Sequence, residues 1–278
     1  MTGSKTGYKK DGEGGAVRTD IVVNKIDEIR SCPGEKYTNI YTPVASAGRD
    51  DWDAITSEHT ICLLYTEGSA SRVQFMSSDR NELCQVLNQL GEDTTIDIIG
   101  RDTEQLSDIM TEGGFSVLAR MQRWANKDIS GVMEDKSPMR LRYGESDPGI
   151  VATEDDASDI LAIYRKVFDT RVSHLPTIEE LKKSIRNKEV IIHKDNDDIH
   201  TILQCTIELR RFYIHQAFND GMKSWLHGII FNELEKYYKL GGRYMYAWVQ
   251  DTNIASQRMN AKYGMKPDGL WDMVYTKV

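Results

Sequence analysis

The sequence predicts an α/β (α+β) protein that is organised as two consecutive domains. Short apolar runs typical of strands alternate along the chain with apolar residues at helical spacing. Residues 127–149 are rich in Asp, Lys, Ser and Gly and contain Pro138 and Pro148, which can neither donate to a strand ladder nor continue a helix. With 278 residues, 40% of them hydrophobic, the chain can form a substantial core in each of two modest domains.

The domain boundaries follow from these shifts in composition. We expect a mostly disordered segment at 1–35, because apolar periodicity begins only at Ile21–Ile29. We then expect a first domain at 36–130, a linker at 131–150 and a second domain at 151–278.

The first domain is predicted to begin with a hairpin and a helix. His59–Tyr65 and Arg72–Met76 are apolar runs joined by a Gly-containing turn, as in two paired strands. Asn81–Leu90 carries its apolar residues on one helical face, and Gly91 follows as a stop. The remaining elements are a strand, a helix and a long strand at Thr94–Ile99, Glu104–Met110 and Phe115–Trp124.

The second domain is predicted to open with two helices, each preceded by a capping sequence. Thr153–Asp156 and Thr177–Glu180 place a hydroxyl cap three positions before an acidic residue. The later elements are strands at Val190–His193, His200–Glu208 and Phe212–Phe218, a helix from about Ser224 to Gly241, a strand at Tyr244–Val249, a helix from Thr252 to Gly264, and a strand at Leu270–Tyr275.

Composition excludes several classes of protein. The four cysteines form no CxxC pair, so we expect reduced and mostly buried thiols rather than a zinc ribbon. The net charge of −8 arises before Gly149, and neither half has the basic surface of a nucleic-acid binder. No apolar run could cross a bilayer and the first residues lack a signal sequence, so we expect a cytoplasmic protein without a membrane partner.

An internal repeat links the two halves. Ile98–Phe115 and Ala247–Met265 both read as a strand, Asp-Thr, a Met eight residues after the Asp, and then Gly with an apolar residue. Any strand–cap–helix–Gly unit produces part of this pattern, so coincidence is the alternative. The favoured interpretation is a tandem duplication whose first copy lacks the two opening helices.

The second half resembles the GNAT N-acyltransferase superfamily. Ala152–Asp169 is similar to the opening helix of that family, and Asn253 through Gly264–Met265 is similar to its closing motif. The tandem layout also resembles beta-lysine N-acetyltransferases and Fem-type aminoacyl transferases. The resemblance implies two tandem GNAT-like domains, each with a mixed, mostly antiparallel sheet flanked by helices, of which the first is degenerate.

The same resemblance implies an N-acetyltransferase that moves an acetyl or small acyl group from acyl-CoA, typically acetyl-CoA, to a primary amine by direct attack. The amine acceptor would be a small molecule, an amino acid or a peptide, and the protein a monomer or homodimer without a metal. Two other hypotheses remain open. One is a catalytically silent tandem GNAT-like binding protein; the other is a transferase that uses aminoacyl-tRNA or a carrier protein as donor.

The candidate donor site is the loop Asn219–Leu226, which joins a strand to a helix. The first turn of a helix offers unpaired N–H groups to a pyrophosphate. GNAT proteins use Arg/Gln-x-x-Gly-x-Gly/Ala here, whereas this loop contains one glycine and a bulky Trp225. An ordinary loop without a ligand is therefore the alternative. The candidate cofactor-binding residues are Phe218, Gly221, Lys223, Ser224 and Asn253.

The candidate catalytic residues are Glu208, His215 and Tyr263. Glu208 or His215, at the end of one strand and on the next, is the candidate base that removes a proton from the ammonium. Many relatives carry a Tyr acid seven residues after the motif Asn, but that position is Asn260, which has no useful proton. Tyr263 is the substitute acid, with a core aromatic as the favoured alternative.

Overall fold

The computed structural model describes residues 18–42, 44, 52–67, 70–196, 198–208, 210–221 and 225–278. The chain divides into two compact units. Unit 1 consists of Met1–Arg120, Thr170–Val172 and Trp271–Val278, and unit 2 consists of Met121–Asp169 and Ser173–Leu270.

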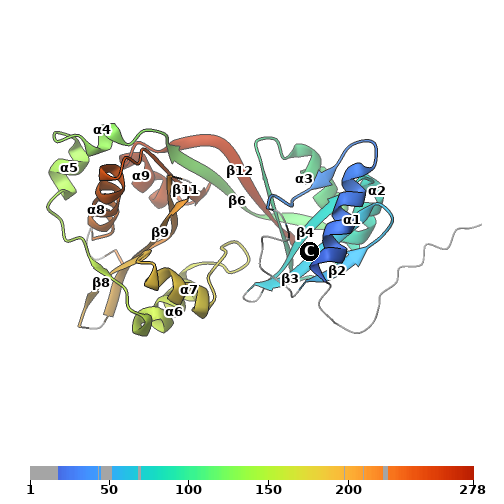
Figure 1. Cartoon of the computed structure of the whole chain (residues 1–278), viewed down its shortest axis with the longest axis horizontal. Helices are drawn as coiled ribbons and strands as arrows, with labels where there is room; N and C mark the ends of the chain where they lie inside the picture. Colours follow the sequence, from blue (N-terminus) through green and yellow to red (C-terminus); the bar gives the residue numbers. More distant parts are fainter. Residues whose placement is uncertain are drawn as a thin grey trace, which may run out of the picture. The chain divides into compact units, whose positions relative to one another are not determined.

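Unit 1 contains an antiparallel sheet with one parallel pair (Figure 1). Its strand order is β2-β3-β4-β5-β12, β1 pairs with β4, and only β4 and β5 are parallel. The elements are α1 (Thr19–Ser31), β1 (Tyr37–Thr38), β2 (Asp53–Thr56), β3 (Thr60–Glu67), β4 (Ala70–Ser77), α2 (Arg80–Asn88), β5 (Thr94–Gly100), α3 (Glu104–Glu112), the start of β6 (Phe115–Asn126) and the end of β12 (Lys266–Lys277).

Alternating residues of β3 assign the helices of unit 1 to opposite faces of the sheet. Ile61 and Leu63 pack with α1, whereas Cys62 packs with α2 and α3. Successive side chains of a strand point to opposite faces, so β3 is buried on both sides. Burial raises the pKa of the Cys62 thiol to about 12, which keeps this cysteine unreactive.

Unit 2 repeats this arrangement of a mostly antiparallel sheet with one parallel pair. Its order is β6-β11-β10-β9-β8-β7, and only β10 and β11 are parallel. The elements are α4 (Ser130–Met133), α5 (Pro138–Tyr143), β7 (Ile150–Val151), the short 3-10 turn η2 (Glu154–Asp156), α6 (Ala157–Val167), α7 (Ile178–Arg186), β8 (Val190–Asp195), β9 (Asp198–Glu208), β10 (Arg211–Asn219), α8 (Trp225–Lys239), β11 (Tyr244–Gln250) and α9 (Ile254–Lys262).

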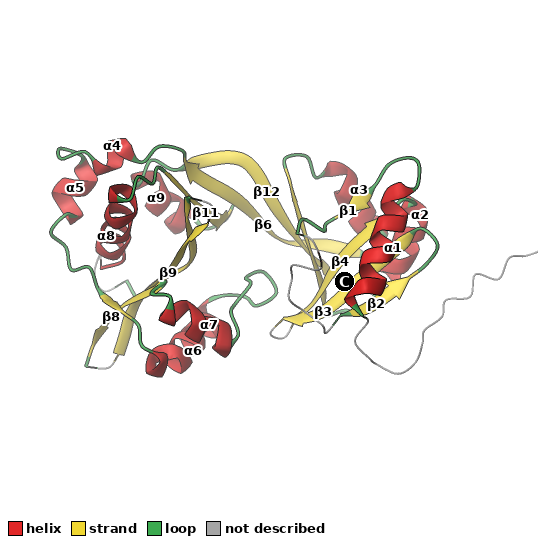
Figure 2. Ribbon diagram, in the orientation of Figure 1, coloured by secondary structure: helices red, strands yellow, loops and turns green. Residues whose placement is uncertain are grey.

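Helices cover both faces of the unit 2 sheet (Figure 2). Ile202 of β9 packs with α6 and α7, and the next residue, Leu203, packs with α8, α5 and α4. The predicted capping boxes at Thr153 and Thr177 are present, with Asp156 and Glu180 bonding back to the cap amide. These caps satisfy N–H groups that the helix leaves unpaired.

Two segments contain helices where the sequence predicted a mostly disordered segment and a domain linker. Helix α1 forms inside 1–35, because Val22, Ile26 and Ile29 lie on one face and are buried against β3 and β4. Helices α4 and α5 form inside the predicted linker at 131–150, and Met139 and Tyr143 join the core of unit 2. Helices α4 and α5 are short, and short helices with few apolar residues give only weak periodicity.

The unit boundaries also differ from a division at 131–150, because two long strands each contribute to both units. β6 follows α3 of unit 1, yet its Met121–Asn126 segment pairs with β11. β12 follows α9 of unit 2, yet its Trp271–Thr276 segment pairs with β5. Each unit is therefore completed by a strand that lies elsewhere in the sequence.

The internal repeat corresponds to one order of elements in both units. β2-β3-β4-α2-β5-α3-β6 matches β8-β9-β10-α8-β11-α9-β12, and each series has its parallel pair at the same place. Gly114 and Gly264, which the repeat aligned, both have positive φ angles, of 78° and 70°, which favour glycine. The predicted tandem α/β fold is thus confirmed.

Candidate functional site

The candidate site of unit 2 lies where the parallel strands β10 and β11 separate. Their pairing runs from Arg211↔Tyr244 to Ile214↔Ala247, after which β10 continues with β9 and β11 continues with β6. A bulge interrupts β10 between Ile214 and Gln216. In the sheet order formed by the described residues, no strand lies between β10 and β11. The facing backbone groups beyond Ile214 are therefore positioned to bond a ligand.

A group of polar side chains lies on three neighbouring strands beside this separation, and we call it the His215 cluster. Oγ1 of Thr206 is 2.7 Å from Nε2 of His215, and Oε1 of Glu208 is 3.9 Å from the same nitrogen. The Tyr246 hydroxyl donates to Oε2 of Glu208 at 3.0 Å. The Tyr213 and Tyr246 rings are stacked with centroids 4.5 Å apart, and Tyr213 lies 3.9 Å from the His215 ring. The cluster thus brings together Glu208 and His215, which the sequence offered as alternative candidates for the base.

Electrostatics favour a neutral His215. Burial lowers its pKa below the ordinary value, and the nearby Glu208 and Glu189 carboxylates oppose that shift. Tyr246 has the opposite character, because burial and its bond to Glu208 raise the pKa of the phenol. At neutral pH the cluster therefore holds a neutral imidazole beside a protonated phenol, and the imidazole is able to accept a proton.

Arg123 of β6 supports the cluster from the neighbouring strand. Its guanidinium lies 5.8 Å from the centroid of the Tyr246 ring. It is held by Asp268, which accepts bonds of 2.8 and 2.6 Å from Nε and Nη2. Because the Asp268 side chain is only 8% exposed, this ion pair is a fixed part of the site's wall.

The loop before α8 is partly described. Gly221 is exposed, has a φ of 86°, and has open space where a Cβ would stand. Lys223 and Ser224, predicted to bind the donor, lie outside the described residues. Asp220 is bonded to His200 across the base of the loop. The loop therefore has an open glycine, but it lacks the pair of small residues, Gly-x-Gly/Ala, of the GNAT pattern.

Trp225, the first residue of α8, does not have the small side chain of the GNAT pattern at this position. Its ring stacks on His193 with centroids 3.7 Å apart and an interplanar angle of 12°. His193 also lies 3.2 Å from Asp147, and His200 is bonded to Asp220. Within the described part of the chain, no three His, Cys, Asp or Glu side chains gather as a metal site requires.

The remaining donor candidates are placed differently. Asn253 caps α9, its side chain accepting from the Ser256 amide at 3.0 Å. Phe218 is partly buried against the core formed with α6 and α7, in the part of β10 beyond the separation. Phe218 is near the end of β10, and Asn253 follows the end of β11, so both residues come from the segments where these two strands end.

Tyr263 is a fully buried side chain. Its hydroxyl donates to the His227 carbonyl at 3.0 Å and lies 3.1 Å from Nδ1 of His227. Burial raises the pKa of Tyr263 well above 10, which disfavours loss of its proton. Asn260 is also buried, and its Nδ2 donates to the Ser256 carbonyl within α9. This geometry suits core residues better than a general acid.

Two cations lie near the first turn of α8. Burial, together with the charges of Lys262 and Arg142, lowers the pKa of His227 to about 4. Nζ of Lys262 is 3.3 Å from Nε2 of His227. Positive side chains beside a helix N-terminus favour an anion there.

Unit 1 fills the corresponding separation with its own chain. β4 and β5 pair only at Ser71↔Thr94 and Arg72↔Thr95. Beyond these pairs, Nδ2 of Asn39 donates to the carbonyls of Val73 and Asp97, one on each strand, at 2.9 and 3.1 Å. Asn39 also accepts from the Phe75 amide at 2.7 Å. These backbone groups of unit 1 are thus already bonded.

Sequence reasoning missed Thr206, Tyr213 and Tyr246. A signal was present, because Thr206 and Glu208, like Tyr213 and His215, alternate along a strand and so share a face. Polar side chains on one face of central strands are unusual and indicate a site. Asn39 and Arg123 carried no such signal, because their roles depend on partners far away in the sequence.

Comparison with known proteins confirms the fold. No protein-family profile matches the chain, and no curated protein matches it. A GCN5-related N-acetyltransferase from Sphaerobacter thermophilus is 12% identical, with a TM-score of 0.51, over 78% of this chain and 76% of that chain. A GNAT-family acetyltransferase from Colwellia psychrerythraea is 9% identical, with a TM-score of 0.50, over 93% and 96% of the two chains.

A tandem GNAT protein from the clavulanic acid biosynthesis pathway is 10% identical, with a TM-score of 0.51, over 93% of this chain and 86% of that chain. At these identities the similarity establishes the fold, so the chain has the GNAT fold in tandem. None of the helices formed by the described residues is both long and apolar enough to cross a bilayer.

Proposed function

We propose that this protein is an N-acyltransferase that moves an acetyl or small acyl group from acyl-CoA to a primary amine of a small molecule, amino acid or peptide. The observation that carries the proposal is the position of the His215 cluster, at the point where β10 and β11 separate. A strand separation can bond an extended donor through backbone groups, and the cluster supplies a base beside it.

His215 is the proton acceptor in this proposal. The imidazole first takes a proton from the ammonium of the acceptor. The free amine nitrogen then bonds to the acyl carbon while the carbon–sulfur bond of the thioester breaks, and the second amine proton is lost to solvent as the amide forms. Glu208, 3.9 Å from the imidazole, stabilises the imidazolium that forms. Thr206 orients the ring through its contact of 2.7 Å. Tyr263 and Asn260 belong to the core, so the leaving thiolate takes its proton from solvent.

Unit 2, rather than unit 1, holds the donor. The edges of β10 and β11 beyond Ile214 suit its amide groups, whereas Asn39 bonds the equivalent groups of unit 1. The phosphates of the donor would bind near Gly221 and the start of α8, where Lys262 and Arg142 supply positive charge. The other proposed contacts to the donor are Lys223, Ser224, Phe218 and Asn253. The site's fit is incomplete at the loop, where Trp225 replaces a small residue. Binding must therefore rely more on charge and on the strand edges than on glycine amides.

The first experiment is thermal unfolding of the whole chain with and without acetyl-CoA. A ligand that binds only the folded state raises the unfolding temperature as its concentration grows. We expect a shift that is lost in Gly221→Val, because a β-branched residue is strained at a φ of 86°. Gly241→Val is the matched control, since Gly241 also has a positive φ and an exposed, open position, but lies at the end of α8.

A thiol-release assay with a panel of primary amines then tests turnover. His215→Gln should abolish thiol release while preserving the acetyl-CoA shift. A shift without turnover by any amine would favour the silent binding protein. Absence of a shift with several acyl-CoAs would contradict the proposal and favour a donor other than CoA.

A further inference from the structure

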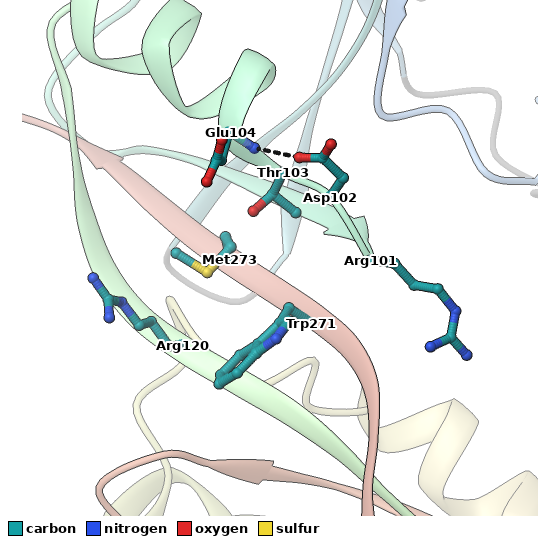
Figure 3. Close-up of a pocket in the computed structure, with 7 residues that line it drawn as sticks. All are labelled: Arg101, Asp102, Thr103, Glu104, Arg120, Trp271 and Met273. Atoms are coloured by element: carbon teal, nitrogen blue, oxygen red, sulfur yellow. Dashed lines mark hydrogen bonds between the residues drawn. The ribbon is translucent and has the colours of Figure 1, made fainter.

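Unit 1 contains a cavity of about 520 Å³ beside the first turn of α3. Trp271, Met273 and Tyr275 lie on one face of β12, because alternate residues of a strand share a face. Helix α3 covers Tyr275, whose hydroxyl donates to Ser107 at 2.6 Å. Since α3 begins at Glu104, Trp271 and Met273 extend past its end and form the cavity floor (Figure 3).

Charged groups of both signs surround this apolar floor. Glu104 and Asp102 stand above it at the start of α3, and Arg120 on β6 stands to one side, as Figure 3 shows. Arg101 lines the opposite side. The volume is within the range of small-molecule sites. The cavity is open to solvent and most of its lining is polar, so charge complementarity must select its ligand.

This set of charges disfavours a phosphate. The Asp102 carboxylate accepts from the Glu104 amide at 3.2 Å, so the helix end is already capped by a negative group. Two carboxylates at the same end would repel a multiply charged anion, and the arginines would repel a simple cation. A molecule with one positive and one negative group satisfies both sides.

We propose that this cavity binds a free amino acid with an apolar side chain, as its zwitterion. The ammonium contacts Glu104 and Asp102, the carboxylate contacts the Arg120 guanidinium, and the side chain lies on the Trp271 indole and the Met273 thioether. Carboxylate–guanidinium bonds are among the stronger hydrogen bonds, and sulfur and aromatic groups pack well on apolar side chains. None of these residues belongs to the His215 cluster, so the site is independent of the proposed transfer reaction.

Isothermal titration calorimetry tests the proposal with three probes: L-phenylalanine, N-acetyl-L-phenylalanine and L-phenylalaninamide. The first carries both charges, the second lacks the ammonium, and the third lacks the carboxylate. We expect L-phenylalanine to bind at millimolar concentration or better, and each analogue to bind at least about tenfold more weakly, since each loses one charged hydrogen bond.

Two variants identify the partner of each charge. Glu104→Gln should weaken the binding of L-phenylalanine. It should also remove most of the difference in affinity between L-phenylalanine and N-acetyl-L-phenylalanine. Arg120→Gln should do the same for the preference over L-phenylalaninamide. Glu92→Gln and Arg30→Gln are matched controls, because they remove the same charges at exposed positions of unit 1 outside the cavity. Circular dichroism confirms that each variant is folded.

Three results would overturn the proposal. The first is no binding of L-phenylalanine, L-leucine or L-methionine by the folded chain. The second is equal binding of all three probes. The third is binding that Arg120→Gln leaves unchanged and His215→Gln abolishes, which would place the amino acid in the acceptor site of unit 2.

Discussion

Oγ1 of Thr206 lies 2.7 Å from Nε2 of His215, on the strand next to it. This contact fixes the orientation of the imidazole ring. A positioned base is worth more than a mobile one, because the proton must be taken from one direction.

Thr206→Val should therefore lower kcat/KM by about tenfold, because the isosteric side chain cannot hydrogen-bond the ring. Thr206→Ser keeps the hydroxyl and should keep most of the activity. Thiol release at several amine concentrations measures the effect. Equal activity of the Val and Ser variants would exclude a positioning role for Thr206.

The acid limb of the pH–rate profile should lie below the ordinary histidine pKa of about 6.5. His215 accepts a proton only when neutral, and burial lowers its pKa, so activity is retained as the pH falls to that lowered value. Glu208 raises the pKa of His215, so Glu208→Gln should move the limb to still lower pH. If Glu208→Gln instead abolished turnover at every pH, Glu208 would be the base.

His227 should make the free energy of unfolding depend on pH. Its pKa is lowered to about 4 in the folded state, against about 6.5 when unfolded. The unfolded chain thus binds the proton first, so this stabilisation is complete above pH ~6.5 and is lost as the pH falls toward ~4. In urea unfolding, His227→Gln should lose less stability between neutral and acidic pH than the natural chain. Parallel pH dependence in both proteins would contradict this.

Asn39→Ala should destabilise unit 1 by about 2–4 kcal/mol, because it leaves buried backbone groups of β4 and β5 without their partner. The side chain is buried, so water cannot easily replace it. Asn81→Ala, at an exposed position of α2, is the control. Chemical unfolding of both variants provides the comparison, and equal midpoints would mean that the groups find other partners.

Local patterns sufficed for most of the fold. The apolar runs of β3 and β11 and the capping boxes at Thr153 and Thr177 predicted elements that are present. The sequence could not predict that β6 pairs with a strand of unit 2 and β12 with a strand of unit 1. An alternating apolar pattern is compatible with either neighbouring strand. The internal repeat indicated two units, but it did not indicate which strand completes the sheet of each unit.

The site was only partly predictable for the same reason. Glu208 and His215 were selected by residue type, which reports what a side chain can do. Tyr246 joins them because β11 lies beside β10, and Arg123 because β6 lies beside β11. These residues become neighbours through the pairing of strands that are distant in the sequence. No local periodicity in a single sequence reveals which strands pair.

The side chain of Asn39 bridges β4 and β5 as an amide of a bound ligand would. Unit 1 therefore carries a built-in substitute for a ligand, and we expect its stability to be independent of the acyl-CoA concentration. In the proposed function the donor takes the equivalent place between β10 and β11 of unit 2. A rising donor concentration should then raise the unfolding temperature of unit 2 alone. The stability of one half of the chain would thus follow the supply of a metabolite, while that of the other half would not.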